Sequence, residues 1–244
     1  MISAVICAAG VSKRMGGVKK EYRLLPGSCL TVLGAAVSTF ASVPSIDVIV
    51  IAVPDDSETG EAAARNAIPP ELLAGKNSPP VKFVCGGKNR QASVFNALTE
   101  LSTSPPGYVL IHDGARPWVS PGLIGHIIAE VKNHGAVVPI VPLTETPKEL
   151  EIPKHPTPNS LLRQSRTPTI KRHLKRSAVG VAQTPQAFAF NGIFAAHKEA
   201  ALKEDTEGVE FTDDAEIWAA FCGSVAAVPG EPENRKITFP EDLC

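Results

Sequence analysis

A glycine-rich segment with several cationic side chains is the feature of this sequence best suited to chemistry. Residues 7–22 read CAAGVSKRMGGVKKEY and follow the short apolar run Ala4–Ile6. A turn of small residues after a strand exposes backbone N–H groups, and cationic side chains beside them are suited to binding a polyphosphate. The cations are Lys13, Arg14, Lys19 and Lys20. The alternative is a strand-to-helix turn with a solvated basic face.

The spacing of the glycines excludes two common nucleotide-binding motifs. After Gly10 the next glycine is Gly16, which is followed by Gly17 and not by lysine. This pattern matches neither the dinucleotide fingerprint GxGxxG nor the P-loop GxxxxGK[ST]. We therefore expect a nucleotide-handling protein that is neither a dehydrogenase nor a P-loop NTPase.

A second glycine-containing segment follows another apolar run. Gly86 and Gly87 precede Lys88–Arg90, and Ser93 falls on the first turn of the next predicted helix. Two adjacent glycines let a ligand approach the backbone closely. A simple Gly–Gly turn is an equally good interpretation of this pattern taken alone.

The segment His112–Pro117 places a carboxylate and a guanidinium after a third apolar run. Asp113 can hold a metal ion, and Arg116 can hold an anion. The alternative is a local ion pair, but an exposed pair is worth only about 0–1 kcal/mol. The end of a buried strand is a costly place for a carboxylate, which favours the functional interpretation.

Three further polar segments have structural interpretations when they are considered singly. Thr184–Phe188 is predicted to be a rigid turn set by Pro185. Thr212 is predicted to cap a helix whose first turn holds two aspartates. Lys236 lies near the C-terminus, where spacing alone would not distinguish it from a solvated lysine. The histidines show no ligand spacing, so a structural zinc site is not expected.

The predicted elements around these residues alternate between strands and helices. Short runs rich in Val and Ile predict strands at 2–7, 48–53, 81–85, 109–112, 136–141 and 225–228. Apolar residues at helical spacing predict helices at 30–41, 90–101 and 121–131. This alternation predicts an α/β fold, a three-layer sandwich with a mainly parallel sheet. In such sheets ligands bind beyond the carboxyl ends of the strands, where the segments described above are found.

The segment at about 142–178 interrupts this alternation. Six prolines lie between residues 142 and 168, and residues 152–198 contain basic side chains but neither Asp nor Glu. We expect a single domain over 1–244 with an excursion here. The excursion is either a mobile basic surface loop or an arm that packs on a second subunit and places a cation over its site.

Composition limits the class of protein. The net charge of −1 and the aromatic content of 5% argue against a nucleic-acid or anionic-membrane partner. No apolar run approaches the roughly 20 residues that span a bilayer, and Met1 leads directly into a strand. The five cysteines form no CxxC pair, and an odd number suits a reducing compartment. We expect a cytoplasmic globular protein.

Taken together and in order, the motifs resemble one family. The matching segments are CAAGVSKRM with Lys20, GGKNRQASV, HDGARP, ETPK, R-x7-TPQAF, TDDA and NRKITFPEDL, which extend over residues 4–243. This set is similar to the 2-C-methyl-D-erythritol 4-phosphate cytidylyltransferases, which belong to the nucleotidyltransferases of the glycosyltransferase-A-like fold. The resemblance implies transfer of CMP from CTP to a sugar-alcohol phosphate with release of pyrophosphate, dependence on Mg²⁺ or another divalent cation, and a homodimer interlocked by the arm.

The resemblance also implies roles for individual residues. Nucleotide binding is implied for Ala8, Ala9, Gly10, Gly87, Ser93 and Gly114, with Gly87 and Ser93 in contact with the cytosine. Arg14 and Lys20 would neutralise charge on the α-phosphate and the leaving pyrophosphate, while Arg176 and Lys236 would bind the acceptor phosphate together with Arg116 and Thr146. Asp113 would stand beside the metal ion and the acceptor hydroxyls, and Arg176 would reach in from the partner's arm. Such a reaction needs positioned cations and no covalent side chain.

Some positions differ from the family pattern, and several alternatives remain open. Lys19 replaces a common proline, and Lys88 occupies a position that is often acidic in relatives. Arg172 is an alternative to Arg176 as the phosphate ligand. Ribitol 5-phosphate is an alternative acceptor, and a non-catalytic nucleotide-binding relative would share the same fold.

Overall fold

An eight-stranded sheet forms the centre of the protein. The computed structural model describes residues 1–10, 15, 19–56, 58–75, 78–152 and 167–243 of the 244-residue chain. The strand order is β10-β5-β9-β4-β1-β2-β3, and β8 pairs with β5. The strands are β1 (Ile2–Cys7), β2 (Val48–Val53), β3 (Val81–Cys85), β4 (Tyr108–Asp113), β5 (Ala136–Pro142), β8 (Gly180–Ala182), β9 (Gln186–Ala189) and β10 (Ala226–Pro229).

The six predicted strands are present, but the sheet holds two more. β1 pairs in parallel with β2 and β4, and β3 and β10 also pair in parallel with their neighbours. β9 lies antiparallel between β4 and β5. Its residues Gln186–Ala189 fall largely within the segment that the sequence predicted to be a rigid turn, so that prediction was incomplete. The strand starts directly after Pro185, which cannot itself donate to the ladder.

Helices cover both faces of this sheet. They are α1 (Val32–Ala41), α2 (Glu61–Asn66), α3 (Pro70–Leu73), α4 (Arg90–Leu101), α5 (Pro121–His134), α6 (Phe190–Glu207) and α7 (Asp214–Phe221), with 3-10 turns η2 (Lys20–Tyr22), η3 (Arg176–Ala178) and η4 (Pro240–Leu243). The three predicted helices are confirmed. None of the helices in the described part of the chain combines the length and apolar character that crossing a membrane requires.

The longest helix, α6, was not predicted. Its buried face consists of Phe190, Ile193, Ala196, His197 and Ala200. Two alanines and a histidine give a weak apolar period, so the helix depends on packing against its neighbours more than on its own sequence signal.

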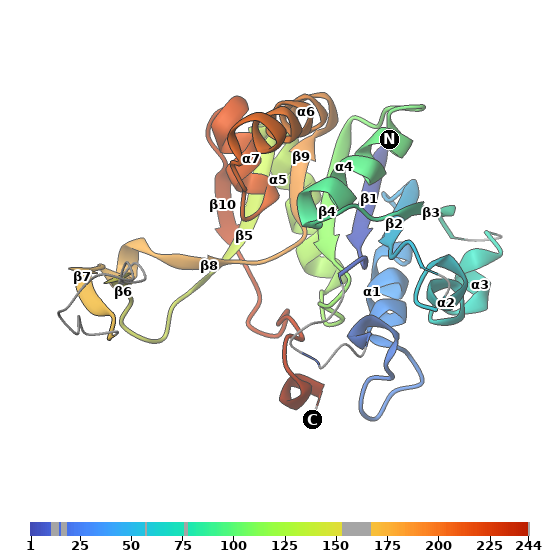
Figure 1. Cartoon of the computed structure of the whole chain (residues 1–244). Helices are drawn as coiled ribbons and strands as arrows, with labels where there is room; N and C mark the ends of the chain where they lie inside the picture. Colours follow the sequence, from blue (N-terminus) through green and yellow to red (C-terminus); the bar gives the residue numbers. More distant parts are fainter. Residues whose placement is uncertain (11–14, 16–18, 57, 76–77, 153–166, 244) are drawn as a thin grey trace, which may run out of the picture.

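Alternate residues of the strands enter two separate cores. Ala4 and Ile6 of β1 pack in one core with α1 and α5, while Val5 packs in the other with α4, α6 and α7. This is the period of two that places successive side chains on opposite faces of a strand. The result is the three-layer α/β sandwich that the sequence predicted, seen in Figure 1.

A second, two-stranded sheet lies apart from the main one. β6 (Lys148–Glu151) and β7 (Thr169–His173) pair antiparallel and project beside β8 in Figure 1. Glu149 of β6 forms ion pairs with Lys171 and Arg172 across the pair, at 2.7 and 2.9 Å. We refer to residues 142–152 and 167–182 as the arm.

Backbone hydrogen bonds continue past the carboxyl ends of the parallel strands. Gly114 N–H donates to the carbonyl of Cys7 at 2.9 Å, and Gly86 N–H donates to that of Val53 at 2.7 Å. The loops that leave β1, β3 and β4 are therefore held side by side at one edge of the sheet.

Close packing at Gly192 provides a test of the α6–α7 layer. A Cβ atom there would lie 2.6 Å from Cζ3 of Trp218, whose ring stacks on Phe188. We expect Gly192→Ala to lower the free energy of unfolding by about 1–3 kcal/mol because the indole must move. Gly125→Ala is the control: Gly125 is exposed within α5 with no atom within 4 Å of the added Cβ. It should stabilise by up to about 1 kcal/mol. Denaturant unfolding measures both, and equal stabilisation would contradict the packing described.

Candidate active site

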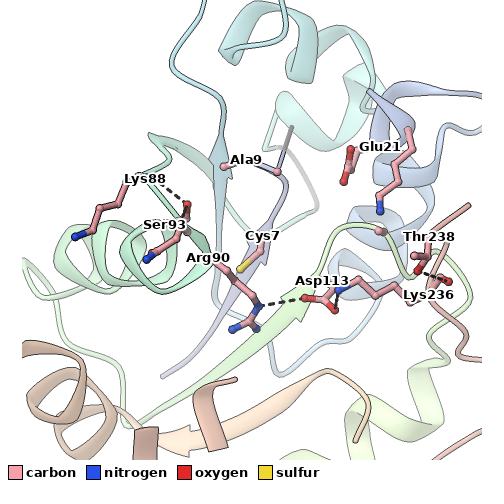
Figure 2. A pocket seen from close by; sticks show the side chains of 14 residues that line it. Cys7, Ala9, Glu21, Lys88, Arg90, Ser93, Asp113, Lys236 and Thr238 are labelled. Carbon is pink, nitrogen blue, oxygen red and sulfur yellow. Dashed lines mark hydrogen bonds and ion pairs between the residues drawn. The ribbon is translucent and has the colours of Figure 1, made fainter. Parts of the chain in front are cut away.

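A cavity opens at the edge of the sheet where these loops meet. Its volume is about 450 Å³, within the ~300–1,000 Å³ range of small-molecule sites. Ala9 and Gly10 after β1, Gly87 and Ser93 around the start of α4, and Asp113 at the end of β4 line it. Lys20 and Lys236 line it as well. Figure 2 shows Lys88 and Ser93 on one side and Lys236 and Thr238 on the other.

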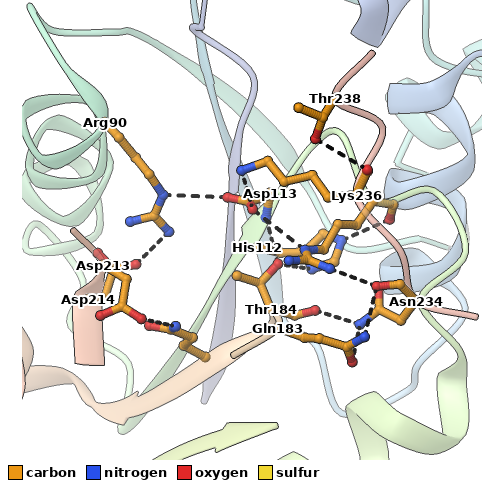
Figure 3. A network of polar contacts seen from close by, with 12 residues as sticks. Arg90, His112, Asp113, Gln183, Thr184, Asp213, Asp214, Asn234, Lys236 and Thr238 are labelled. Carbon is orange, nitrogen blue, oxygen red and sulfur yellow. Dashed lines mark hydrogen bonds and ion pairs between the residues drawn. The ribbon is translucent and has the colours of Figure 1, made fainter. Parts of the chain in front are cut away.

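Three cations surround the Asp113 carboxylate. Lys236 Nζ lies 2.9 Å from Oδ2, Arg116 Nε lies 3.6 Å from Oδ2, and Arg90 Nε lies 3.4 Å from Oδ1. Burial acts to raise the pKa of Asp113, but these cations outweigh it and hold that pKa well below the usual range. Asp113 is therefore a carboxylate at neutral pH, and the cluster around it is net positive. Figure 3 shows Arg90 and Lys236 approaching it from opposite sides.

A buried histidine and threonine hold Asp113 in place. Thr184 Oγ1 accepts the backbone N–H of Asp113 at 3.0 Å and contacts Nδ1 of His112 at 3.1 Å. The other ring nitrogen of His112 lies 3.1 Å from the carbonyl of Arg116. Burial lowers the pKa of His112 from 6.5 to about 4, so the ring is neutral at physiological pH. We infer a structural role for it, since both nitrogens are engaged.

A fully buried asparagine attaches the C-terminal segment to the site. The carbonyl of Asn234 accepts from Arg116 at 2.7 Å, and its Nδ2 donates to the carbonyl of Thr184 at 2.8 Å. Ile237 N–H then donates to the carbonyl of Ala115 at 2.9 Å. Lys236 lies between these anchors, which explains how a lysine far along the chain comes to contact Asp113.

The charge network continues from the cavity into the core. Arg90 Nη2 donates to Asp214 Oδ2 at 2.6 Å, and Asp214 Oδ1 lies 3.2 Å from Nε2 of His197. Burial acts to raise the pKa of Asp214, but Arg90 and His197 lower it to about 2. The predicted cap at Thr212 was wrong. Asp213 caps α7 by accepting from Glu216 N–H at 2.9 Å, and the fully buried Asp214 forms an ion pair with Arg90. A helix-start pattern does not distinguish a solvated aspartate from one that a distant arginine neutralises.

Lys19 organises the backbone after β1. Its side chain is 7% exposed, and its Nζ donates to the carbonyls of Ala8 and, at 2.6 Å, Gly10. Glu21 lies 3.4 Å from the same nitrogen. Lys19 is therefore engaged with protein groups, while the adjacent Lys20 lines the cavity.

The structure brings most of the predicted site residues together. Those that line the cavity are Ala9, Gly10, Lys20, Gly87, Ser93, Asp113 and Lys236. Ala8 and Gly114 are buried next to residues that line the cavity, and Arg116 contacts Asp113, which lines it. Arg14 lies outside the described residues. Gly87 N–H donates to Ser93 Oγ at 3.0 Å, so these two predicted base ligands also bond to each other.

Two predicted residues do not lie at this cavity. Thr146 and Arg176 are exposed in the arm, where Arg176 Nη1 donates to the carbonyl of Thr144 at 2.8 Å. Arg172, the alternative to Arg176, pairs with Glu149 across the arm's own sheet. Neither arginine is among the residues that line the cavity of the same chain.

Sequence reasoning missed three residues that shape the site. Arg90, Thr184 and Asn234 each lie within motifs that the family resemblance used, but no role was predicted for them. The available signal was the presence of polar side chains next to strand ends. Their partners are 23, 71 and 118 residues distant in the chain for the Arg90–Asp113, Thr184–Asp113 and Asn234–Arg116 contacts, so the contacts themselves could not be inferred.

The curated relatives extend beyond this chain. A "Bifunctional enzyme IspD/IspF" from Bradyrhizobium sp. (strain ORS 278) is 37% identical over 245 residues, covering 99% of this chain and 54% of the relative. A protein of the same name from Rhodospirillum rubrum is 34% identical over 244 residues, covering 99% and 55%. The chain thus spans about half the length of the curated relatives it matches.

Solved structures share the whole fold. 4-diphosphocytidyl-2C-methyl-D-erythritol synthase from Anaerococcus prevotii superposes with a TM-score of 0.76 at 28% identity, covering 100% of this chain and 92% of that chain. The 2-C-methyl-D-erythritol 4-phosphate cytidylyltransferase from Thermus thermophilus gives a TM-score of 0.69 at 28% identity, covering 100% and 96%.

The family model described as "IspD: 2-C-methyl-D-erythritol 4-phosphate cytidylyltransferase" matches residues 2–244. This match includes every segment that forms the cavity. The chain therefore belongs to the 2-C-methyl-D-erythritol 4-phosphate cytidylyltransferase family.

Proposed function

We propose that this chain transfers CMP from CTP to 2-C-methyl-D-erythritol 4-phosphate and releases pyrophosphate. The observation that carries the proposal is the convergence of Lys20, Asp113 and Lys236 on one cavity with the Gly87–Ser93 loop. An acidic centre surrounded by cations suits two anionic substrates, and the glycine-containing loop opposite it leaves room for a base. This arrangement is supported by membership of the family.

In the proposed reaction, an oxygen of the acceptor phosphate attacks the α-phosphorus of CTP. The new P–O bond forms as the bond to the β-phosphate breaks, and pyrophosphate leaves. A phosphate monoester is largely ionised at neutral pH, so no strong general base is required. Lys20, with Arg14 as implied by the resemblance, would offset negative charge on the α-phosphate and the leaving group. Lys236 and Arg116 would hold the acceptor phosphate beside Asp113.

The donor set fits a divalent cation that the substrate itself helps to hold. Within the described residues, no group of three or more His, Cys, Asp or Glu side chains could hold a metal ion. Asp113 and Glu21 are the two carboxylates that line the cavity. Mg²⁺ commonly takes one or two carboxylates, with phosphate oxygens and water completing its shell. Both oxygens of Asp113 already contact cations, so we propose that Asp113 stands beside such an ion while the substrate phosphates mainly hold it. When bound, the ion would neutralise charge on the phosphate oxygens.

We also propose that the arm completes the site of a second subunit in a homodimer. Arg176 is exposed, and its contact within the arm is to a backbone carbonyl, whereas Arg172 is paired with Glu149. Arg176 is therefore the better candidate for an external phosphate. Leu150, Ile152 and Ile170 of the arm are each at least 50% exposed, which supports an interface there.

The cysteines are relevant to the cellular compartment of the protein. Cys7, Cys29, Cys85 and Cys222 are free thiols. These support a proposed reducing compartment, the cytoplasm, for the single nucleotidyltransferase domain at 1–244.

The acceptor assay tests the reaction itself. Purified protein with CTP and Mg²⁺ should release pyrophosphate when methylerythritol phosphate is added. Ribitol 5-phosphate should give much less. Release with ribitol 5-phosphate alone would refute the proposed acceptor, and CTP binding without turnover on either acceptor would indicate a non-catalytic relative.

Lys236 and its neighbour Arg235 form a matched pair. Arg235 places its guanidinium 4.6 Å from the ring centre of Trp118 and does not line the cavity, whereas Lys236 contacts Asp113. We expect Lys236→Met to lower kcat/KM for the acceptor by about 10²-fold or more, since the acceptor phosphate loses one of the two cations proposed to hold it. Arg235→Met should change it by less than about threefold. Steady-state kinetics decides, and similar losses in both variants would contradict the assignment.

Co-expression of two impaired variants tests the arm. We expect Lys20→Ala to lower turnover by roughly 10²-fold, and we expect Arg176→Ala to weaken binding of the acceptor more than binding of CTP. If Arg176 acts on the partner's site, a mixed dimer has one site with both residues intact. Co-expressed variants should then recover about a quarter of wild-type activity. Activity no higher than that of the separate variants would show that Arg176 does not act in trans.

A further inference from the structure

The loop between β3 and α4 is tied to the C-terminal end of α6 by contacts that the proposed reaction does not use. Lys88 Nζ lies 3.0 Å from Glu204 Oε1 and 3.3 Å from Asp205 Oδ1. Asn89 Nδ2 donates to the same Oε1 of Glu204 at 2.8 Å. Lys88 and Asn89 both line the cavity, whereas Glu204 and Asp205 do not.

Asn89 is the residue that connects this contact to the cavity wall. Its Oδ1 accepts from Ala92 N–H at 2.8 Å and so caps α4. Its carbonyl accepts from Ser93 Oγ at 2.8 Å, and that hydroxyl in turn accepts from Gly87 N–H at 3.0 Å. A chain of hydrogen bonds therefore runs from Glu204 through Asn89 and Ser93 to Gly87.

The two acidic residues of α6 differ in burial. The side chain of Glu204 is 13% exposed, whereas that of Asp205 is 72% exposed. Carboxylates near the C-terminus of a helix are disfavoured by its dipole, and an exposed ion pair returns little stability. A half-exposed lysine therefore does not by itself account for Glu204. Asn89 is less exposed than Lys88, and the hydrogen bond between Glu204 and Asn89 is the contact that the burial of Glu204 favours.

We propose that Glu204 is a positioning residue for recognition of the base. It orients the Asn89 amide, and through Asn89 it fixes the spacing of Gly87 and Ser93. This inference rests on the proposed function, in which the loop from Gly87 to Ser93 receives the base, as the family resemblance implies for these two residues. Cytosine and uracil differ in the donors and acceptors of one edge, so a rigid polar wall leaves a group unpaired when the wrong base binds. If the loop from Gly87 to Ser93 becomes mobile, it can form hydrogen bonds with cytosine or with uracil.

Three variants separate this role from a general effect of charge. Glu204→Met removes both the charge and the acceptor, Glu204→Gln removes the charge but keeps an acceptor for Asn89, and Asp205→Asn removes only a contact to Lys88. Calorimetry with CTP and with UTP measures binding without turnover. We expect Glu204→Met to lower the affinity for CTP about tenfold and to reduce the preference for CTP over UTP. The KM of the acceptor should not change.

The matched variants carry the opposite expectations. Glu204→Gln should recover most of the CTP affinity, and Asp205→Asn should remain within about twofold of the wild type. Equal effects of Asp205→Asn and Glu204→Met, or an unchanged CTP/UTP preference in Glu204→Met, would overturn the inference. A purely structural role would lower the melting temperature without changing that preference.

A fourth variant, at Asn89, tests the same contact from its other end. Asn89→Asp keeps an oxygen to cap α4 but replaces the donor to Glu204 with an acceptor. It should lower the affinity for CTP and the preference of the protein for CTP over UTP, as Glu204→Met does. Wild-type values of both quantities would overturn the inference. The two proposals fail separately. A wild-type protein that does not bind CTP refutes the proposed function, whereas a wild-type protein that binds CTP, with Glu204→Met equal to it, refutes the role of Glu204 alone.

Discussion

The organisation of this protein depends on one buried negative charge. Asp113 is 8% exposed at the end of a central strand, and its carboxylate is held by Arg90, Arg116 and Lys236. Removing a carboxylate from water is costly unless opposite charges and hydrogen bonds compensate. These cations come from α4, from the loop after β4 and from the C-terminal segment. The electrostatic requirement of Asp113 thus holds three distant parts of the chain at one edge of the sheet.

The same requirement explains the polar side chains behind the cavity. Neutral His112 and Thr184 fix the backbone of Asp113, and Asn234 fixes the segment that carries Lys236. Arg90 is held on its other side by Asp214, which is fully buried. Each cation at the site therefore has protein partners that set its position before any substrate arrives. Preorganised charges of this kind need little rearrangement when negative charge develops in a reaction.

The loop that faces this centre is organised differently. Gly87 and Ser93 are held by hydrogen bonds within the loop and, through Asn89, by Glu204 of α6. The centre near Asp113 is built from charge, whereas this wall is built from directional hydrogen bonds. Such a division suits a substrate with a polyanionic end and a neutral, polar end.

Local patterns in the sequence predicted the elements better than the contacts between them. The Val- and Ile-rich runs predicted β1, β2 and β3 with the bounds that the structure has. β1 and β2 are buried on both faces and are therefore almost wholly apolar, whereas β3 is a partly exposed edge strand that includes Lys82. The antiparallel strand β9 follows Pro185 in a segment predicted as a turn, and α6 buries alanines and a histidine. Neither segment shows a strong apolar periodicity, so both depend on contacts with neighbours that are remote in the chain.

The amino-acid sequence alone was enough to predict the alternation of strands and helices, the sheet edge at which the cavity lies and the residues that match the family. These follow from hydrophobic periodicity and from motifs that lie within short segments. The packed fold was needed to show that Asp214 is paired with Arg90, that Lys19 binds carbonyls while Lys20 lines the cavity, and that Glu204 supports Asn89. A charged side chain acquires its role from its partners. Those partners lie far away in the sequence and become neighbours only when the sheet and its helices pack.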